Sequence, residues 1–365
     1  MMCGIRFALL FLILLLLAPD PAEAQQRSGV RAQGREIIQE QNAAPTTSGA
    51  TSQVLDFREE MRRFVQSIGK FARGHRPDFM VIPENGLELL VKIDPSDPDV
   101  RHLARTYMRS INGIVQDGLF YGVPELDKPT EEKRRESLLP LARIAKKAGL
   151  KVLVKDYVKT PRTVDAARRQ AAKEGFIFFG SPSRGLDMAT VPTYPRRPYG
   201  ESANSVVSLK SVNNYLMIRE SSGFGRVDEF ALKMHENNFD LVVVNIFHSL
   251  GKPLSRQAVE TLKYKKLGAK RLVFAYVDIA SAASDDFFWK DHWREGSPGW
   301  ISAAVPGNPD RYFVQYWHPE WRQIISGDAN SYIYGVVRQG FDGVILGGMD
   351  TFRYFEGGLD ALAQQ

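Results

Sequence analysis

The chain has 365 residues, of which 44% are hydrophobic and 25% charged, which suits one large globular domain or two small ones. The formal net charge of +6 is spread along the chain without a polybasic block, so we expect no nucleic-acid partner. Cys3 is the sole cysteine, which excludes disulfides, a thiol nucleophile and cysteine-ligated metals from the rest of the chain.

The first 24 residues have the pattern of a secretory signal. Arg6 supplies a positive charge, residues 7–17 form an unbroken apolar run, and Ala22-Glu23-Ala24 fits the small-x-small cleavage rule. The run is short for a membrane span. We therefore expect cleavage after Ala24, no stable membrane span in the mature protein and a secreted or periplasmic location, with an uncleaved anchor as the alternative. Residues 25–53 have few bulky apolar side chains, which predicts a flexible leader.

From residue 54 onward, short β-branched runs alternate with helical patterns. Apolar residues at helical spacing predict an opening helix from Phe57 to Phe71. Eight apolar runs then predict strands at 79–85, 111–122, 151–157, 176–181, 214–220, 240–248, 271–279 and 342–348. Helical patterns lie between most of them, for example at 131–149, 161–174, 226–237 and 254–267.

Apolar strands that alternate with helices indicate an α/β protein with a parallel sheet covered on both faces. Eight such units close naturally into a (β/α)8 TIM barrel, which we expect over residues 54–365. A doubly wound open sheet is the alternative, although no GxGxxG motif follows a first strand. The connection 182–212 is long and rich in Pro, Ser and Gly, and we expect it to cross the amino-terminal face or the side of the barrel.

Acidic residues stand at the carboxyl ends of six predicted strands, where the loops of a barrel form its open face. They are Glu84, Asp117, Asp156, Glu220, Asp278 and Asp350. A single acid in such a place is a weak signal, because surface loops carry many acids. Several acids on one rim would perturb one another's pKa values, as in a catalytic cleft.

All five tryptophans fall between Trp289 and Trp321, together with several Phe and Tyr residues. Large aromatic faces are typical of binding sites, and sugar rings stack on them. Trp317 and Trp321, four residues apart, are equally consistent with packing residues of one helix. Trp289, Trp293 and Trp300 lie in a segment broken by Pro and Gly, where an exposed platform is somewhat favoured.

The histidines form no metal-binding motif, since neither HExxH nor a close pair occurs, and we expect neither a metal nor a cofactor. His248 ends a predicted strand and could donate a proton at the rim, although a loop histidine with satisfied hydrogen bonds is the more common case. No serine has a nucleophile elbow around it, which argues against serine hydrolase chemistry.

Several segments resemble the endo-α-1,4-polygalactosaminidase-like glycoside hydrolases. The strongest match is YWHPEW followed by a helix and GFDGVILGGMD (316–350), where the family usually has YWDPEW and GFDGVYLDIID. IPENG, INGIVQDGLFY and VKDY resemble the second half of that family, whereas FDLVVVNIFHS and RLVFAYVDIASAASDDFFW resemble its first half. Because the second half comes first here, the resemblance implies a circularly permuted barrel.

The resemblance implies an exported glycoside hydrolase that acts through two carboxylates on an extracellular or cell-surface polysaccharide, a class that includes polymers of amino sugars. The best-matched acids, Asp156 and Asp350, are the expected catalytic pair, with Asp278 as a substitute for an acid that the family has at Asn245. The expected substrate-binding residues are Glu84, Asn85, Asp117, Tyr121, Asn245, His248, Trp293 and Trp300.

Three family acids are missing from this chain. Asn245 and Gly347 replace two of them, and the segment 279–283, ending at Ala283, has no carboxylate where the family has a Glu-bearing one. A catalytically impaired glycan-binding protein that uses the same cleft is therefore the alternative. The basic pI of about 9.2 favours a neutral, acetylated or acidic glycan over a polycationic one.

Overall fold

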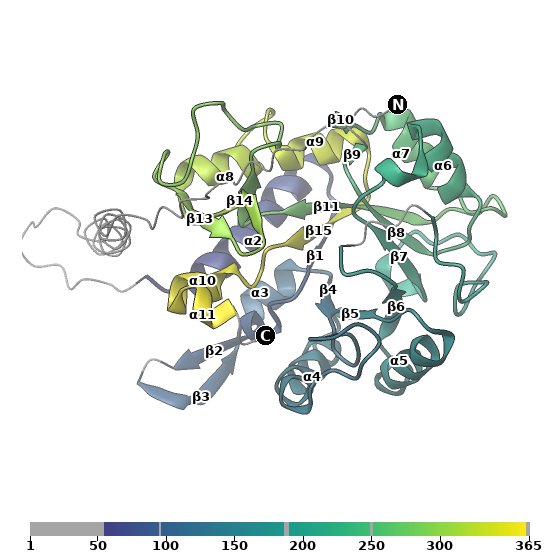
Figure 1. Cartoon of the computed structure of the whole chain (residues 1–365), viewed down its shortest axis with the longest axis horizontal. Helices are drawn as coiled ribbons and strands as arrows, with labels where there is room; N and C mark the ends of the chain where they lie inside the picture. The colour runs from purple at the N-terminus through teal and green to yellow at the C-terminus, as the bar shows by residue number, and fades with distance from the viewer. Residues whose placement is uncertain (1–54, 95, 186–189, 249–250, 363–365) are drawn as a thin grey trace, which may run out of the picture. The chain divides into compact units, whose positions relative to one another are not determined.

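The computed structural model describes residues 55–94, 96–185, 190–248 and 251–362 (Figure 1). The expected signal sequence and most of the expected leader lie outside these residues. Within them, no helix combines the length and the apolar character needed to cross a membrane.

Eight parallel strands form the centre of the molecule. They are β1 (Met80–Pro83), β4 (Gly113–Asp117), β5 (Lys151–Tyr157), β6 (Ile177–Ser181), β7 (Tyr215–Ile218), β8 (Leu241–Asn245), β11 (Leu272–Asp278) and β15 (Gly343–Gly347). Each lies within one of the eight predicted runs, and most of their residues are buried. The α/β class with parallel strands is therefore confirmed.

The strands are arranged in two hydrogen-bonded sheets. One has the order β1-β15-β11-β8-β7 and the other has the order β4-β5-β6. A parallel bridge between Glu84 and Val115 links the end of β1 to β4, and β6 contacts β7. All of the described ladders within these two sheets are parallel, so the carboxyl ends of the strands in each sheet point the same way.

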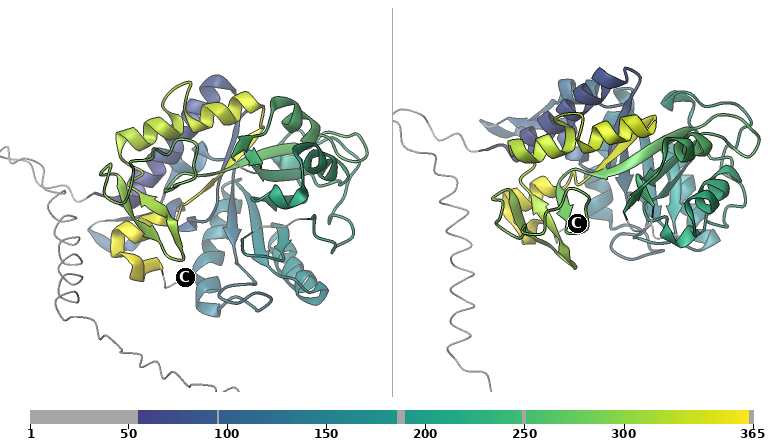
Figure 2. Two further views of the ribbon diagram at one scale, coloured as in Figure 1. Left: turned by 45° about the horizontal axis from the view of Figure 1, so that its top comes forward. Right: turned by 90° about the horizontal axis from the view of Figure 1, so that it is seen from above.

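Helices pack outside the strands (Figures 1 and 2). They are α2 (Phe57–His75), α3 (Arg105–Ser110), α4 (Glu132–Lys147), α5 (Pro161–Glu174), α6 (Val227–His235), α7 (Arg256–Leu262), α8 (Pro319–Ser326), α9 (Tyr332–Gln339), α10 (Thr351–Gly357) and α11 (Leu359–Leu362). Local sequence sets their ends. Asp56 caps α2 by accepting a hydrogen bond from the Glu59 amide, and α5 ends at Gly175 in the left-handed region (φ 68°).

The described chain also contains antiparallel strands that were not predicted from the sequence. A hairpin is formed by β2 (Val91–Asp94) and β3 (Asp97–Leu103), and a small pair by β9 (Phe247–His248) and β10 (Lys252–Pro253). A third sheet joins β12 (Ser281–Ala283), β14 (Asn308–Val314) and β13 (Ile301–Val305). The aromatic segment expected to be a loop therefore contains a hairpin, and the one helix expected before Gly340 is two helices, α8 and α9.

The described part of the connection 182–212 begins at the carboxyl ends of the strands and reaches their amino-terminal ends. Near its start, Arg184 donates to the carbonyls of Gly122 and Pro124, after β4, and its guanidinium lies 5.5 Å from the centre of the Tyr157 ring. Farther along, the Val206 amide donates to the carbonyl of Lys270, just before β11, over 2.8 Å. Lys151, the first residue of β5, donates its Nζ to the carbonyl of Lys210 over 3.0 Å. The later part of the connection thus lies beside the amino-terminal ends of the strands, as predicted.

Candidate functional site

A buried lysine and two carboxylates form the centre of the candidate site. Lys155, near the end of β5, is fully buried. Its Nζ lies 2.5 Å from Oε1 of Glu84 and 2.9 Å from Oδ2 of Asp117. These residues end β5, β1 and β4, so the parallel arrangement brings three strand ends to one cluster.

Neighbouring side chains hold Asp117 in place. The Tyr157 hydroxyl donates to Oδ2 of Asp117 over 2.9 Å. Oδ1 of Asn85 accepts from the Asp117 amide and from Nε2 of Gln116, each at 2.9 Å. Asn85 is itself in the left-handed region (φ 68°), and strain of this kind in a non-glycine residue is concentrated at functional sites.

A second cation lies across the site. Arg219, directly after β7, donates to the Tyr276 hydroxyl over 3.1 Å, and its guanidinium lies 5.0 Å from the centre of the Tyr276 ring. A Cβ atom at Gly347 would lie 2.1 Å from the same hydroxyl oxygen. Tyr276 therefore fills the space that a side chain at position 347 would need.

The charges in this cluster shift the pKa values of its members. Burial alone would raise the pKa of Glu84, but the charges of Lys155 and Arg219 outweigh it and hold that pKa below the usual range. Burial and the charge of Glu84 raise the pKa of Asp117, against the opposing effect of Lys155. Burial opposes the charged form of Lys155, but Asp117 and Glu84 raise its pKa above the usual value.

Asp350 is a half-buried acid just beyond β15, at the start of α10. Burial, followed by the charge of Glu88, raises its pKa to about 7, while the cations of Arg353 and Arg134 oppose the shift. The charge of Asp117 raises it further. A carboxyl group with this pKa holds a proton for about half of the time at neutral pH.

Asp156 lies on the other face of β5 from Lys155 and Tyr157, because side chains alternate along a strand. Its Oδ1 accepts from the Phe120 amide over 3.1 Å, and Oδ2 is buried without a hydrogen-bond partner among the described residues. Burial raises the pKa of Asp156 to about 7, against the backbone amides of the 119–121 loop. Asp117 is among the charges that raise the pKa of Asp350.

Asp278 and Asn245 are engaged in local turns. Oδ1 of Asp278 accepts from the amides of Ala280 and Ser281, and its Oδ2 accepts from the Ser281 hydroxyl over 2.9 Å. Oδ1 of Asn245 accepts from the Phe247 amide over 3.1 Å. These contacts give both side chains a structural role that the sequence patterns did not reveal.

His248 is 1% exposed, and both of its ring nitrogens have partners. Nδ1 lies 2.8 Å from the Ser221 hydroxyl and Nε2 lies 2.8 Å from the Gly225 carbonyl. The imidazole also stacks on Phe230. A buried His248 with both ring nitrogens in hydrogen bonds is better explained as a structural residue than as a contact to substrate.

The tryptophans divide into core and partly exposed side chains. Trp300 is 1% exposed, donates its Nε1 to Glu320 over 2.9 Å and packs against Trp321. It is a core residue, which corrects the expectation of an exposed platform. Trp293 is half-buried, with its ring perpendicular to that of Trp300, and Tyr121 is also half-buried. Only these two of the three predicted aromatic contacts keep surface available to a ligand.

The cations of the site, Lys155 and Arg219, were not predicted from the sequence. They stand at the ends of strands that are otherwise apolar, and a buried charge in such a run is a usable signal because it needs a partner. Asp286 was not predicted either; burial raises its pKa to about 6, and its Oδ2 accepts from the Ala283 amide over 2.7 Å.

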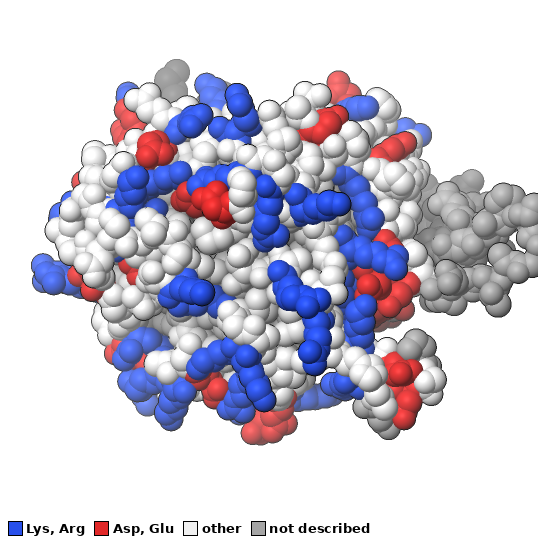
Figure 3. Space-filling view, turned by 180° about the vertical axis from the view of Figure 1, so that it is seen from behind, with Lys and Arg blue, Asp and Glu red and all other residues white. Residues whose placement is uncertain are grey.

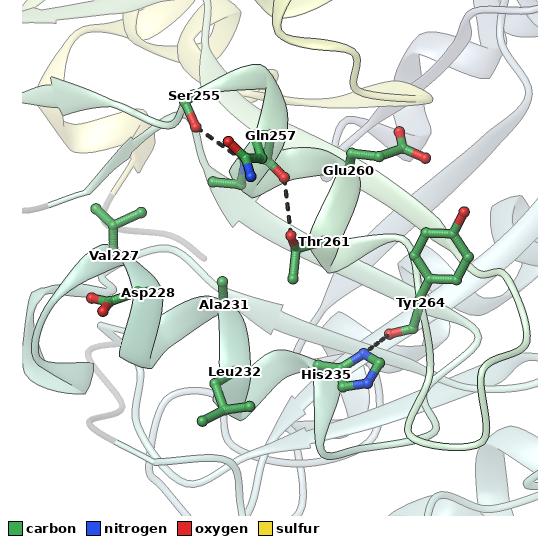
Figure 4. Close-up of a pocket in the computed structure, with 11 residues that line it drawn as sticks. Val227, Asp228, Ala231, Leu232, His235, Ser255, Gln257, Glu260, Thr261 and Tyr264 are labelled. Carbon is green, nitrogen blue, oxygen red and sulfur yellow. Dashed lines mark hydrogen bonds between the residues drawn. The ribbon is translucent and has the colours of Figure 1, made fainter.

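A groove with a volume of about 750 Å³ lies between α6 and α7 and includes Leu232, His235 and Tyr264 (Figure 4). None of the predicted site residues lines it. No group of three or more His, Cys, Asp or Glu side chains in the described segments is arranged to hold a metal ion.

No family model matches the chain. Curated proteins match parts of it. An uncharacterized protein of Methanocaldococcus jannaschii is 35% identical over 136 residues, which is 37% of this chain and 36% of the relative. One of Thermotoga maritima is 31% identical over 124 residues, 34% of this chain and 36% of the relative. One of Deinococcus radiodurans is 29% identical over 172 residues, 47% of this chain and 49% of the relative. The chain thus matches about a third to a half of the length of these relatives, and their names state no activity.

Proposed function

We propose that this protein is a glycoside hydrolase-like protein that acts on a polysaccharide at the carboxyl ends of its parallel strands. The observation that carries the proposal is the half-buried Asp350 at the end of β15, whose pKa is raised to about 7 by burial and by the charges of Glu88 and Asp117. Glycosidases generally need one protonated and one ionised carboxyl group across the scissile bond. In this proposal Asp350 is the proton donor and Asp117 is the second carboxylate.

The surroundings of Asp117 suit a polar ligand. Oδ1 of Asp117 and Oε1 of Gln116 are buried without hydrogen-bond partners among the described residues. Unpaired buried acceptors are costly and call for an explanation such as a ligand or water. Sugar hydroxyl groups could supply the missing donors.

We also propose that the eight parallel strands close into a (β/α)8 barrel. Adjacent strands would follow the order β1-β4-β5-β6-β7-β8-β11-β15, which is their order along the chain, before returning to β1. The Glu84–Val115 bridge and the β6–β7 contact support the two junctions that lack a full ladder. A doubly wound sheet would instead reverse its strand order at a switch point.

Within this proposal the barrel is circularly permuted relative to the polygalactosaminidase-like glycoside hydrolases that it resembles. Partial matches to relatives are compatible with this order, because only one half of a permuted chain can align in sequence at a time. Arg58, in the first turn of α2, forms an ion pair with Glu356 in α10, with Nε and Oε1 2.8 Å apart. The start and the end of the domain are therefore close, as permutation requires.

A non-catalytic glycan-binding protein is the second candidate. Lys155 forms ion pairs with both Glu84 and Asp117, and Asp278 is held in a turn. These contacts engage carboxylates that could otherwise attack an anomeric carbon or activate a water molecule. Tyr276 occupies the space that a carboxylate at position 347 would need.

Measuring turnover and binding on a panel of neutral, acetylated and acidic glycans tests both candidates. We expect Asp350→Asn and Asp117→Asn to abolish turnover while leaving binding within about threefold, and Asp360→Asn, at an exposed acid in α11, to leave both unchanged. In the wild type, kcat/KM should fall as the pH rises through about 7, because Asp350 then loses its proton. Binding without turnover would favour the non-catalytic glycan-binding protein. The absence of both binding and turnover would reject both candidate functions.

A further inference from the structure

A deep groove lies at the opposite end of the strands from the carboxylates. Its volume is about 1080 Å³, at the upper end of the range for ligand pockets. Met80, Asn112 and Lys151, at or just before the starts of β1, β4 and β5, contribute to its lining. The helix α3, the last turn of α4 and residues 208–210 form its walls.

The groove is cationic. Arg105, Arg109, Lys147, Lys151 and Lys210 line it, and no acidic residue is among its lining residues. Arg105, Arg109, Lys147 and Lys210 are exposed, and none of these four forms an ion pair with another described residue. Lys and Arg side chains are spread widely over the rear face of the molecule (Figure 3).

Ordinary helix electrostatics explains only part of this arrangement. Arg109 and Lys147 lie in the last turns of α3 and α4, where a cation interacts favourably with the helix dipole. Arg105 is the first residue of α3, where a cation is disfavoured, and it lies four residues from Arg109, so that two like charges share a helix face. An anion in the groove would relieve both costs.

We propose that this groove binds a linear acidic polysaccharide, as an accessory site for the glycan-directed function proposed above. The cations come from three separate walls, and arginines four apart have Cβ atoms about 5–6 Å from each other, which suits repeated anionic groups better than one headgroup. Guanidinium groups pair carboxylates and sulfates through two parallel hydrogen bonds. A concave surface also fits a polymer chain better than it fits a flat membrane.

The test compares binding of polygalacturonate with binding of its fully methyl-esterified form, which has the same backbone without the charges. Arg109→Glu combined with Lys147→Glu should weaken polygalacturonate binding roughly tenfold, and added salt should weaken wild-type binding. The matched control combines Lys133→Glu with Lys252→Glu, which changes the net charge equally. Lys133 is exposed at the other end of α4, about 21 Å from Lys147. The control should stay within about twofold of the wild type.

Equal losses in the two double variants would overturn the proposal, because they would show a general effect of net charge. Equal binding of the esterified polymer would also overturn it. Poly-L-glutamate bound at least as tightly as polygalacturonate would make the groove an acidic-peptide surface instead. The groove variant should keep whatever turnover the wild type shows on neutral glycans. If the hydrolase proposal fails, the comparison of the two polymers still tests whether the groove binds an acidic polysaccharide.

Discussion

Lys155 determines the electrostatic state of the candidate site. Two buried carboxylates at neighbouring strand ends repel each other, and one of them would protonate without a cation between them. The charge of Lys155 favours the ionised form of both, and it helps to lower the pKa of Glu84 while the pKa of Asp117 stays raised. A buried ion pair adds little net stability compared with apolar packing, but breaking one costs several kcal/mol. The retention of this cluster in an apolar interior is therefore better explained by function than by stability.

Replacing Lys155 with the similarly sized Met should lower the free energy of unfolding by about 3–5 kcal/mol near pH 7. In the wild type, the lowered pKa of Glu84 gives stability that is lost only as the pH falls through that pKa, and the raised pKa of Lys155 gives stability lost only at high pH. In the variant, the pKa values of the carboxylates should rise. Their ionisation then costs stability, which returns as the pH falls toward about 5 and they protonate.

Urea unfolding of both proteins at about pH 7.5 and about pH 5 measures this difference. Other groups that titrate in this range, such as Asp156 and Asp350, are present in both proteins and cancel in the comparison. Lys159→Met, at an exposed position just past β5, should stay within about 0.5 kcal/mol of the wild type. An equal loss at both pH values would contradict the assigned charges.

At the scale of elements, strand periodicity was the most informative sequence signal. The eight parallel strands and the helices α2, α4 and α5 were predictable because each buries a continuous apolar run or stripe. The antiparallel hairpins were not, since neither β13, which is mostly half-buried, nor β14, which runs from exposed to buried positions, has a regular apolar alternation. The acids of the site were predictable as strand-end residues. Their pairing with Lys155 and Arg219 was not, because strand spacing does not show which side chains face one another.

Trp300 shows how an element changes the meaning of a residue. In sequence it lies between Pro and Gly breaks and resembles an exposed sugar platform. In the structure it directly precedes β13 and is packed between Trp293 and Trp321. Trp300 thus belongs to the core between the hairpin and α8. The hydrogen bond from its indole Nε1 to Glu320 links it to the first turn of α8.

Trp300→Ala should therefore lower the free energy of unfolding by about 3–5 kcal/mol, whereas Trp293→Ala, at a half-buried ring, should cost about 1–2 kcal/mol. Trp300→Phe keeps most of the packing and separates the contribution of the hydrogen bond. Urea unfolding gives these values, and a glycan-binding assay on the same proteins completes the comparison. A stable Trp300→Ala variant with weakened glycan binding would restore the platform interpretation.

At the scale of the whole molecule, the order of the strands along the chain is the feature that bears on circular permutation. The segments that resemble the second half of the glycoside hydrolase family lie in residues 55–185, and those that resemble the first half lie in residues 190–362. Each group contributes four of the eight parallel strands. The two groups meet at the β1–β15 ladder, and at the β6–β7 contact in the proposed barrel.

If the barrel is a permuted one, restoring the other chain order should preserve the fold. A chain that runs 190–362, then a flexible Gly–Ser linker of about eight residues, then 55–185 should unfold cooperatively, within about 3 kcal/mol of the same residues in native order. The Arg58–Glu356 ion pair places the ends to be joined close together. The cut between 185 and 190 interrupts none of the eight parallel strands.

A control chain cut between Val154 and Lys155, inside β5, should fail to fold, because it divides a strand paired on both sides. Circular dichroism and urea unfolding of the three chains decide the matter. Loss of cooperative unfolding in the first permuted chain would mean that the covalent link between residues 185 and 190 is needed for folding, and it would contradict the prediction.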